Sequence, residues 1–228
     1  MIDPLKTIGI ERGKPFNPDA KTREILSDAI LEAKTFLEDQ YEHMQPFYEG
    51  GRWFFPATEE THQSILNSFH TPDSYPIDNR AVIYMMAFFS ARHIGESQYY
   101  LMTTRDKNGK PLDGKQTYRL RVPANAPVTQ YWSMTVYNRD THTFIRNAQW
   151  LGRSSQTPGL QKNADGSVDL FFGPAAPAGK ESNWAPTDAN GRFEILARFY
   201  GPQKALFDKS WKLQDLEPET AGKVSVAA

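Results

Sequence analysis

Short apolar segments separated by turn-forming residues fill the chain from position 98 to position 200. This pattern limits the possible folds more strongly than any other feature of the sequence. Residues 117–122 (TYRLRV) alternate with a period of two, as a strand with one solvated face does. Asn-Gly and Asp-Gly pairs, which tolerate positive φ, interrupt the segments. The other predicted strands are residues 98–104, 130–137, 168–172 and 192–200. Since no long helix lies between them, the pattern favours a mainly β, antiparallel β-sandwich over a parallel α/β sheet.

Upstream of these strands the sequence predicts helices. Residues 17–40 predict a long helix that either Asn17 or Asp19 can cap. Residues 59–69 predict a short helix, and the apolar run 81–89 (AVIYMMAFF) predicts a buried strand.

The expected organisation has three parts. Residues 1–72 form an N-terminal helical and aromatic segment that packs on the sandwich, and residues 73–217 form the sandwich itself. Residues 218–228 (PETAGKVSVAA) form a disordered tail.

Composition and charge exclude several classes of protein. The 26 Lys and Arg residues balance 27 Asp and Glu residues, so no global charge attracts a nucleic acid. The absence of cysteine excludes disulfides, thiolate metal sites and a Cys nucleophile. No apolar run approaches the roughly 20 residues of a membrane span, and the first residues lack a signal-peptide pattern. We expect a cytoplasmic protein, or a periplasmic one if the sequence is a fragment of a longer exported protein.

The spacing of the histidines and the lack of known catalytic motifs predict no metal and no cofactor. No two of the five histidines have a metal-binding spacing such as H-x-H or H-x-x-x-H. Glu59 and His62 are half of a carboxylate di-metal motif that has no second half. The chain also lacks G-x-S-x-G, a P-loop and G-x-G-x-x-G.

Arginines near aromatic residues are the candidate binding groups. Arg80 precedes the apolar run, and Arg146, Arg153 and Arg198 have aromatic neighbours in the sequence. Guanidinium groups stacked on rings can form the floor of a pocket for a carboxylate or sulfate, or can instead form internal ion pairs. Ser154 can bind an anion or fix the backbone of its own loop. The full set of candidate ligand-binding residues is Arg80, Arg146, Arg153, Tyr137, Trp132 and Ser154.

Adjacent aromatic residues predict that one outer sheet face is covered. Neighbouring residues of a strand point to opposite faces. If Phe171 and Trp132 face the core, Phe172 and Tyr131 lie under the N-terminal helix, a second subunit or another domain. We therefore expect a homo-oligomer or a partner domain.

Several stretches of the chain together resemble one family. They are LKTIGIERGKPFNPD, DGKQTYRLRVPANAPVTQYWSMTVY, RSSQTPGLQKNADGSVDLFFGP, GKESNWAPT and RFYGPQKALFDKSW. Over residues 5–217 the sequence resembles the bacterial DUF1254/DUF1214 proteins, specifically their DUF1214 C-terminal half. The resemblance implies a jelly-roll-like β-sandwich, joined in longer members to an upstream DUF1254 sandwich and commonly to an export signal. It implies no catalytic residues, and it makes a DUF1254-type domain a possible partner.

Two functions fit these observations. The first is a binding or assembly module for a small polar or anionic ligand or for another subunit, favoured by the lack of any acid–base or nucleophile signature. The second is a hydrolase or lyase acting on a small anionic substrate. In it, Arg80, Arg146 and Arg153 would bind the anion, and Tyr137 or Asp78 would transfer the proton.

Overall fold

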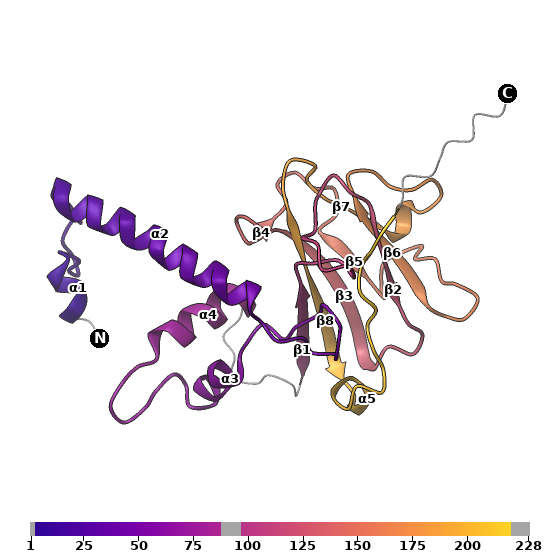
Figure 1. Cartoon of the computed structure of the whole chain (residues 1–228), viewed down its shortest axis with the longest axis horizontal. Coiled ribbons are helices and arrows are strands. Elements are labelled where there is room, and N and C mark those ends of the chain that lie inside the picture. Colours follow the sequence, from indigo (N-terminus) through magenta and orange to yellow (C-terminus); the bar gives the residue numbers. More distant parts are fainter. Residues whose placement is uncertain (1–2, 88–96, 220–228) are drawn as a thin grey trace. The chain divides into compact units, whose positions relative to one another are not determined.

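The alternating segments form two β-sheets in a computed structural model, which describes residues 3–87 and 97–219 (Figure 1). The strands are β1 (Gln98–Thr103), β2 (Tyr118–Val122), β3 (Val128–Asn138), β4 (Thr143–Phe144), β5 (Gly152–Ser154), β6 (Val168–Gly173), β7 (Trp184–Pro186), β8 (Phe193–Pro202) and β9 (Glu217–Pro218). One sheet has the order β1-β8-β3-β4, with β5 also paired to β3, and the other has the order β7-β6-β2-β9. All pairs are antiparallel except β6 with β7. The predicted mainly β sandwich is confirmed, and its jelly-roll connectivity stays a prediction.

The core lies between the two sheets and is rich in rings. Leu120 and Phe172 enter it from one sheet, and Trp132 and Phe199 enter it from the other. The expected orientation of Trp132 is confirmed, whereas Phe172 rather than Phe171 belongs to this core. The reason is register: β6 pairs with β2 so that Phe172 lies opposite Tyr118, one of the alternating buried residues of β2.

The helices include one element that the sequence predicts wrongly. They are α1 (Asp3–Thr7), α2 (Ala20–Glu42), α3 (Glu59–Leu66), α4 (Ile77–Ala87), α5 (Lys204–Phe207) and the short 3₁₀ helix η1 (Glu181–Asn183). The predicted strand at 81–89 is wrong, because residues 81–87 belong to α4, and residues 88–89 lie outside the described residues. Val82 and Ile83 are both buried while Ala81 and Tyr84 are exposed, a helical rather than an alternating pattern. Ile83 packs with Ile65 of α3, so tertiary contact selects the helix.

The chain divides into two units, Met1–His43 and Met44–Ala228. The first unit contains α1 and α2. The predicted long helix is confirmed, and Asp19 is its cap: the Asp19 Oδ1 accepts a hydrogen bond from the Thr22 amide at 2.7 Å. This bond lowers the pKa of the Asp19 carboxyl.

The second unit contains α3, α4 and the sandwich. The predicted division at residue 72, and the packing of the N-terminal segment on the sandwich, stay predictions. The predicted tail falls mostly on residues 220–228, outside the described residues. No helix in the described ranges is long and apolar enough to cross a membrane.

Candidate functional site

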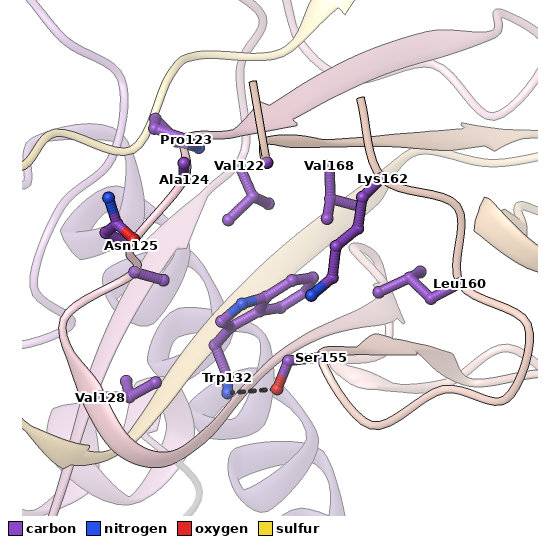
Figure 2. A pocket seen from close by; sticks show the side chains of 12 residues that line it. Val122, Pro123, Ala124, Asn125, Val128, Trp132, Ser155, Leu160, Lys162 and Val168 are labelled. Atoms are coloured by element: carbon purple, nitrogen blue, oxygen red, sulfur yellow. Dashed lines mark hydrogen bonds between the residues drawn. The ribbon is translucent and has the colours of Figure 1, made fainter. Parts of the chain in front are cut away.

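A pocket of about 170 Å³ opens between the sheets where β2 ends and β6 begins (Figure 2). Its lining residues come from both sheets and from the β2–β3 and β5–β6 loops, and most of them have apolar side chains. The lining residues are Val122, Pro123, Ala124, Asn125, Ala126, Val128, Trp132, Ser155, Leu160, Lys162, Gly166 and Val168. Lys162 is the only charged residue among them.

The side chain of Trp132 lines this pocket, and its backbone is hydrogen-bonded to Ser155. The Trp132 amide donates to the Ser155 Oγ at 3.3 Å, and the Ser155 amide donates to the Trp132 carbonyl at 3.0 Å. Because Trp132 is a core residue of β3, one part of its ring packs inside the sandwich while another part meets the pocket. An aromatic ring fixed in this way gives a rigid contact surface for an apolar ligand.

Lys162 extends from the opposite rim toward Trp132 (Figure 2). Its side chain is exposed, and within residues 3–87 and 97–219 its ammonium makes no ion pair or hydrogen bond. An ammonium at the mouth of an apolar pocket attracts the charged end of an anion whose apolar part enters the pocket.

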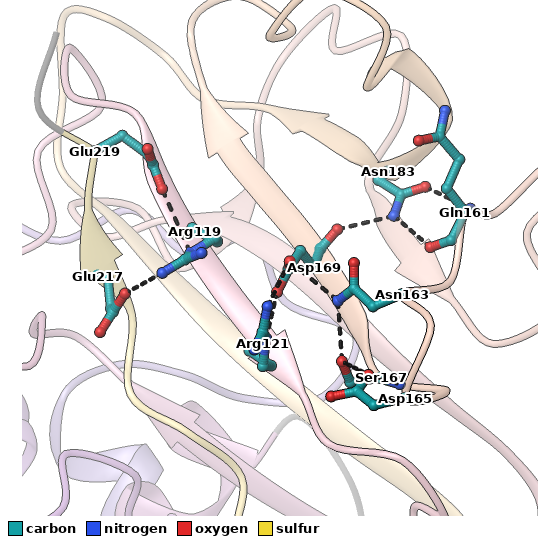
Figure 3. A network of polar contacts seen from close by, with 10 residues as sticks. All are labelled: Arg119, Arg121, Gln161, Asn163, Asp165, Ser167, Asp169, Asn183, Glu217 and Glu219. Atoms are coloured by element: carbon teal, nitrogen blue, oxygen red, sulfur yellow. Dashed lines mark hydrogen bonds and ion pairs between the residues drawn. The ribbon is translucent and has the colours of Figure 1, made fainter. Parts of the chain in front are cut away.

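The loop that carries Lys162 is held in place by the buried side chain of Asn183 (Figure 3). The Asn183 Oδ1 accepts from the Gln161 amide at 2.8 Å, and the Asn183 Nδ2 donates to the Gln161 carbonyl at 2.9 Å. The same Nδ2 donates to the Asp169 carbonyl in β6 at 2.8 Å. These three bonds fix the backbone next to Lys162 against the sheet.

The other rim is the loop 123–126, which includes Asn125 in a left-handed conformation with φ of 54°. Trp211 holds this loop, because its Nε1 donates to the Ala124 carbonyl at 3.2 Å. Asparagine tolerates positive φ better than most residues, so its presence at position 125 suits this turn. The rim is therefore built on fixed backbone.

Of the predicted binding residues, the structure places Trp132 in this pocket, whereas Ser154 does not line it. The Ser154 Oγ accepts from the Gln156 amide at 3.2 Å, and the Ser154 amide donates to the Thr157 Oγ1 at 2.9 Å. Ser154 thus fixes the backbone of its own loop, and the neighbouring Ser155 is the serine that lines the pocket.

The remaining predicted residues lie outside this pocket. Arg80 is exposed on α4, and Arg146 is exposed in the loop that follows β4. Arg153 is buried, with its guanidinium carbon 4.8 Å from the centre of the Trp150 ring, and it donates to two backbone carbonyls. Tyr137 lies on the opposite face of its sheet from the core, in contact with Arg198. None of the three predicted arginines lines this pocket.

A buried cluster of Arg139, His142 and Glu194 has the composition of an acid–base site, but its hydrogen bonds indicate a structural role. The Arg139 Nη1 lies 3.3 Å from the His142 Nε2, and the His142 Nδ1 lies 3.0 Å from the Glu194 Oε1. Because a guanidinium only donates, Nε2 accepts and Nδ1 carries the proton that it donates to Glu194. Both ring nitrogens are engaged, and the charges of Arg139 and Glu194 balance.

Sequence reasoning missed Lys162 and Asn125 as lining residues. Both lie in motifs of the chain, Asn125 in V-P-A-N-A-P and Lys162 in L-Q-K-N-A-D-G. Those motifs were the available signal, because each places a polar side chain in a turn beside an apolar strand. In the described part of the chain, no group of three or more His, Asp or Glu residues could hold a metal ion.

Comparison with known proteins finds one family model that matches part of the chain. Residues 97–204 match the family model of DUF1214, described as a protein of unknown function. All pocket-lining residues fall within that range. No curated protein matches the chain.

Two solved structures resemble the chain. The VPA0106 protein from Vibrio parahaemolyticus matches with a TM-score of 0.52 and 18% identity, over 96% of this chain and 50% of that one. A putative uncharacterized protein from Burkholderia cenocepacia matches with a TM-score of 0.43 and 15% identity, over 99% of this chain and 51% of that one. The chain thus spans about half the length of these proteins, and the first likeness supports the fold alone.

Proposed function

We propose that the domain that matches DUF1214 is a binding module whose pocket takes a small molecule with an apolar body and one negative charge. The observation that carries this proposal is the pairing of Trp132 with Lys162. A rigid indole lies inside the pocket, and the only charged lining residue extends toward it from the rim (Figure 2). An apolar contact surface with one convergent charge is the usual composition of a small-ligand site.

The size of the pocket limits the ligand. An engineered apolar cavity of about 150 Å³ accepts benzene, so a pocket of about 170 Å³ suits one ring or a short branched chain. The apolar wall includes Val122, Leu160 and Val168. A carboxylate on such a body would lie at the mouth, within reach of Lys162, and would keep contact with water.

The alternative function, a hydrolase or lyase, gains no support from this pocket. Its lining residues include no histidine, aspartate or glutamate that could transfer a proton. The hydroxyl of Ser155 accepts from a backbone amide and has no base among the lining residues. The binding function is therefore the one that we propose.

Isothermal titration calorimetry with benzoate, benzyl alcohol and acetate tests this function. At about 0.4–0.5 kcal/mol per non-hydrogen atom, the nine such atoms of benzoate give a dissociation constant of roughly 1 mM. Benzyl alcohol, which lacks the charge, and acetate, which lacks the ring, should both bind more weakly.

The matched variants are Lys162→Gln and, as a control, Lys110→Gln at an exposed lysine that does not line the pocket. An ion pair at a solvated rim contributes about 0.5–1 kcal/mol, so Lys162→Gln should weaken benzoate binding about two- to fivefold, and Lys110→Gln should not. Equal binding of benzoate and benzyl alcohol, or equal effects of the two variants, would refute the proposal.

We also propose that the chain self-associates through α2, as the second candidate function. This helix exposes four large apolar residues, Ile25, Ile30, Leu31 and Phe36. Association of two copies through this helix would remove these side chains from water. A partner domain of DUF1254 type would be an alternative occupant of the same helix.

Multi-angle light scattering between 5 and 100 μM tests self-association. We expect a dimer that the double substitution Ile30→Glu with Leu31→Glu converts to a monomer, while circular dichroism of the sandwich stays unchanged. A wild-type monomer over the whole range would exclude a second copy as the occupant.

A further inference from the structure

The outer face of the sheet that contains β3 and β8 carries an arginine among tyrosines. Strand register places Tyr100, Arg198, Ser133 and Ser154 in one row across β1, β8, β3 and β5. Residues opposite one another in register share a face, and it is opposite to the one that Trp132 presents to the core. This row is therefore separated from the pocket in Figure 2 by the sheet itself.

The guanidinium of Arg198 is held by hydroxyl groups. Its Nη1 donates to the Thr135 Oγ1 at 3.1 Å, and its Nη2 donates to the Tyr137 hydroxyl at 2.5 Å. Its central carbon lies 5.7 Å from the ring centre of Tyr100 and 5.9 Å from that of Tyr137. The group is thus fixed in position by two neutral side chains and flanked by two rings.

No described carboxylate neutralises this guanidinium. Within residues 3–87 and 97–219, Arg198 forms no ion pair, and Glu194 on the same strand is bound by Arg139 and His142. The outer face of the other sheet differs: there Arg119 pairs with Glu217, and Arg121 pairs with Asp169 (Figure 3).

Arg198 has N–H groups left to donate, and its partial burial without a counter-ion carries a free-energy cost that a bound anion would reduce. A guanidinium has five N–H groups, and the two bonds to hydroxyls leave three of them. Arg198 is partly buried, and a charge partly removed from water without a counter-ion is unfavourable. The backbone ladder between β3 and β8 already joins these strands, so holding the sheet together does not require Arg198.

The neighbouring tyrosines keep their protons and shape the site. Burial raises the pKa of Tyr137 and of Tyr100, and the positive charge of Arg198 only partly opposes this. In the adjacent row Tyr131 stacks on Tyr200, with ring centres 4.3 Å apart. Neutral phenols beside a fixed guanidinium form a polar site with aromatic walls.

We propose that Arg198 is the centre of a second binding site, which takes the oxyanion of a small molecule, a carboxylate or a phosphate. The remaining N–H groups of its guanidinium would bind two oxygens of the anion in the forked geometry that arginine favours. Thr135 and Tyr137 act as positioning residues, because they hold the guanidinium in one orientation. This site does not depend on the pocket of Figure 2.

Calorimetric titration with sodium phosphate and with sodium acetate, at constant ionic strength and pH 7, tests the proposal and distinguishes the two anions. We expect at least one of them to bind with a dissociation constant in the millimolar range. Arg198→Gln should weaken that binding at least tenfold, and Arg198→Lys should weaken it because the fork is lost. Arg146→Gln, the same substitution at an exposed arginine, should leave it unchanged.

Tyr137→Phe and Thr135→Val provide a second test of anion binding, which remains usable if the Arg198→Gln variant does not fold. Each removes one hydroxyl that orients the guanidinium, and each should weaken the anion three- to tenfold. The proposal is overturned if neither anion binds the wild-type protein. It is also overturned if binding stays within twofold in Arg198→Gln or, where that variant is unfolded, in both hydroxyl variants.

Discussion

Replacing Asn183 should destabilise the sandwich and displace the loop that carries Lys162. The Asn183 side chain is 2% exposed and makes three hydrogen bonds with the backbone of Gln161 and Asp169. At about 1 kcal/mol for each bond, Asn183→Ala should lower the free energy of unfolding by about 3 kcal/mol. For a unit of this size, that loss lowers the Tm by about 6–12 °C.

The variant Asn183→Asp separates the effect of lost hydrogen bonds from the effect of a smaller side chain. The aspartate keeps an acceptor for the Gln161 amide but turns a carboxylate toward the Gln161 and Asp169 carbonyl oxygens. We therefore expect it to destabilise the protein at least as much as Asn183→Ala, although it is nearly isosteric.

Urea denaturation followed by circular dichroism measures both variants, with Asn190→Ala at an exposed turn as the control. The control should change the free energy of unfolding by less than about 0.5 kcal/mol. The reasoning fails if Asn183→Ala costs less than about 1 kcal/mol, or if Asn183→Asp is as stable as the wild type.

Three further perturbations follow from the same structure. Gly152→Ala would place a Cβ 2.0 Å from the Met134 carbonyl oxygen, so the β3–β5 pairing should break and the Tm should fall by several degrees in a thermal scan. An unchanged Tm would contradict the close approach of Gly152 to the Met134 backbone. Glu194→Gln would remove the carboxylate whose Oε2 lies 3.7 Å from the Nε of the buried Arg139, so we expect urea denaturation to show a loss of about 3 kcal/mol or more in the free energy of unfolding. A loss below about 1 kcal/mol would argue against a stabilising role of this ion pair. Burial raises the pKa of Tyr48 to about 12, above its unfolded value near 10. The stability that protonated Tyr48 contributes is therefore complete below pH 10 and is lost as the pH rises toward 12. Denaturation at stepped pH with tyrosinate absorbance should show that Tyr48 ionises together with unfolding, and full ionisation near pH 10 in the folded protein would disprove this prediction.

The strands were predictable because their physics is local. Residues 118–122 alternate buried and partly exposed side chains, and the Asp-Gly turns beside them need little tertiary support. The run at residue 81 was not predictable in the same way, because a short apolar run fits a buried helix or a buried strand equally well. The contact between Ile65 and Ile83 decides it, and that contact depends on the folding of α3.

Only those residues of the candidate site that lie on a strand were predictable from the sequence. Trp132 follows from the alternation of β3, but the position of Lys162 depends on bonds between Gln161 and Asn183, which is 22 residues further along the chain. Arg198 similarly gains its surroundings from the register of three strands, which adjacent residues in the sequence do not reveal. Side chains that are positioned by long-range pairing were therefore missed.

The most direct measurement of the central claim is a benzoate titration followed by NMR of protein labelled with ¹⁵N-tryptophan. The chain has five tryptophans, so five indole signals are expected, and Trp132→Phe identifies the one that belongs to the pocket. We predict that the Trp132 signal shifts most and saturates, and that Lys162→Gln moves its midpoint to higher benzoate concentration. A Trp132 signal that stays fixed while the others shift, or no saturable shift at all, would contradict it.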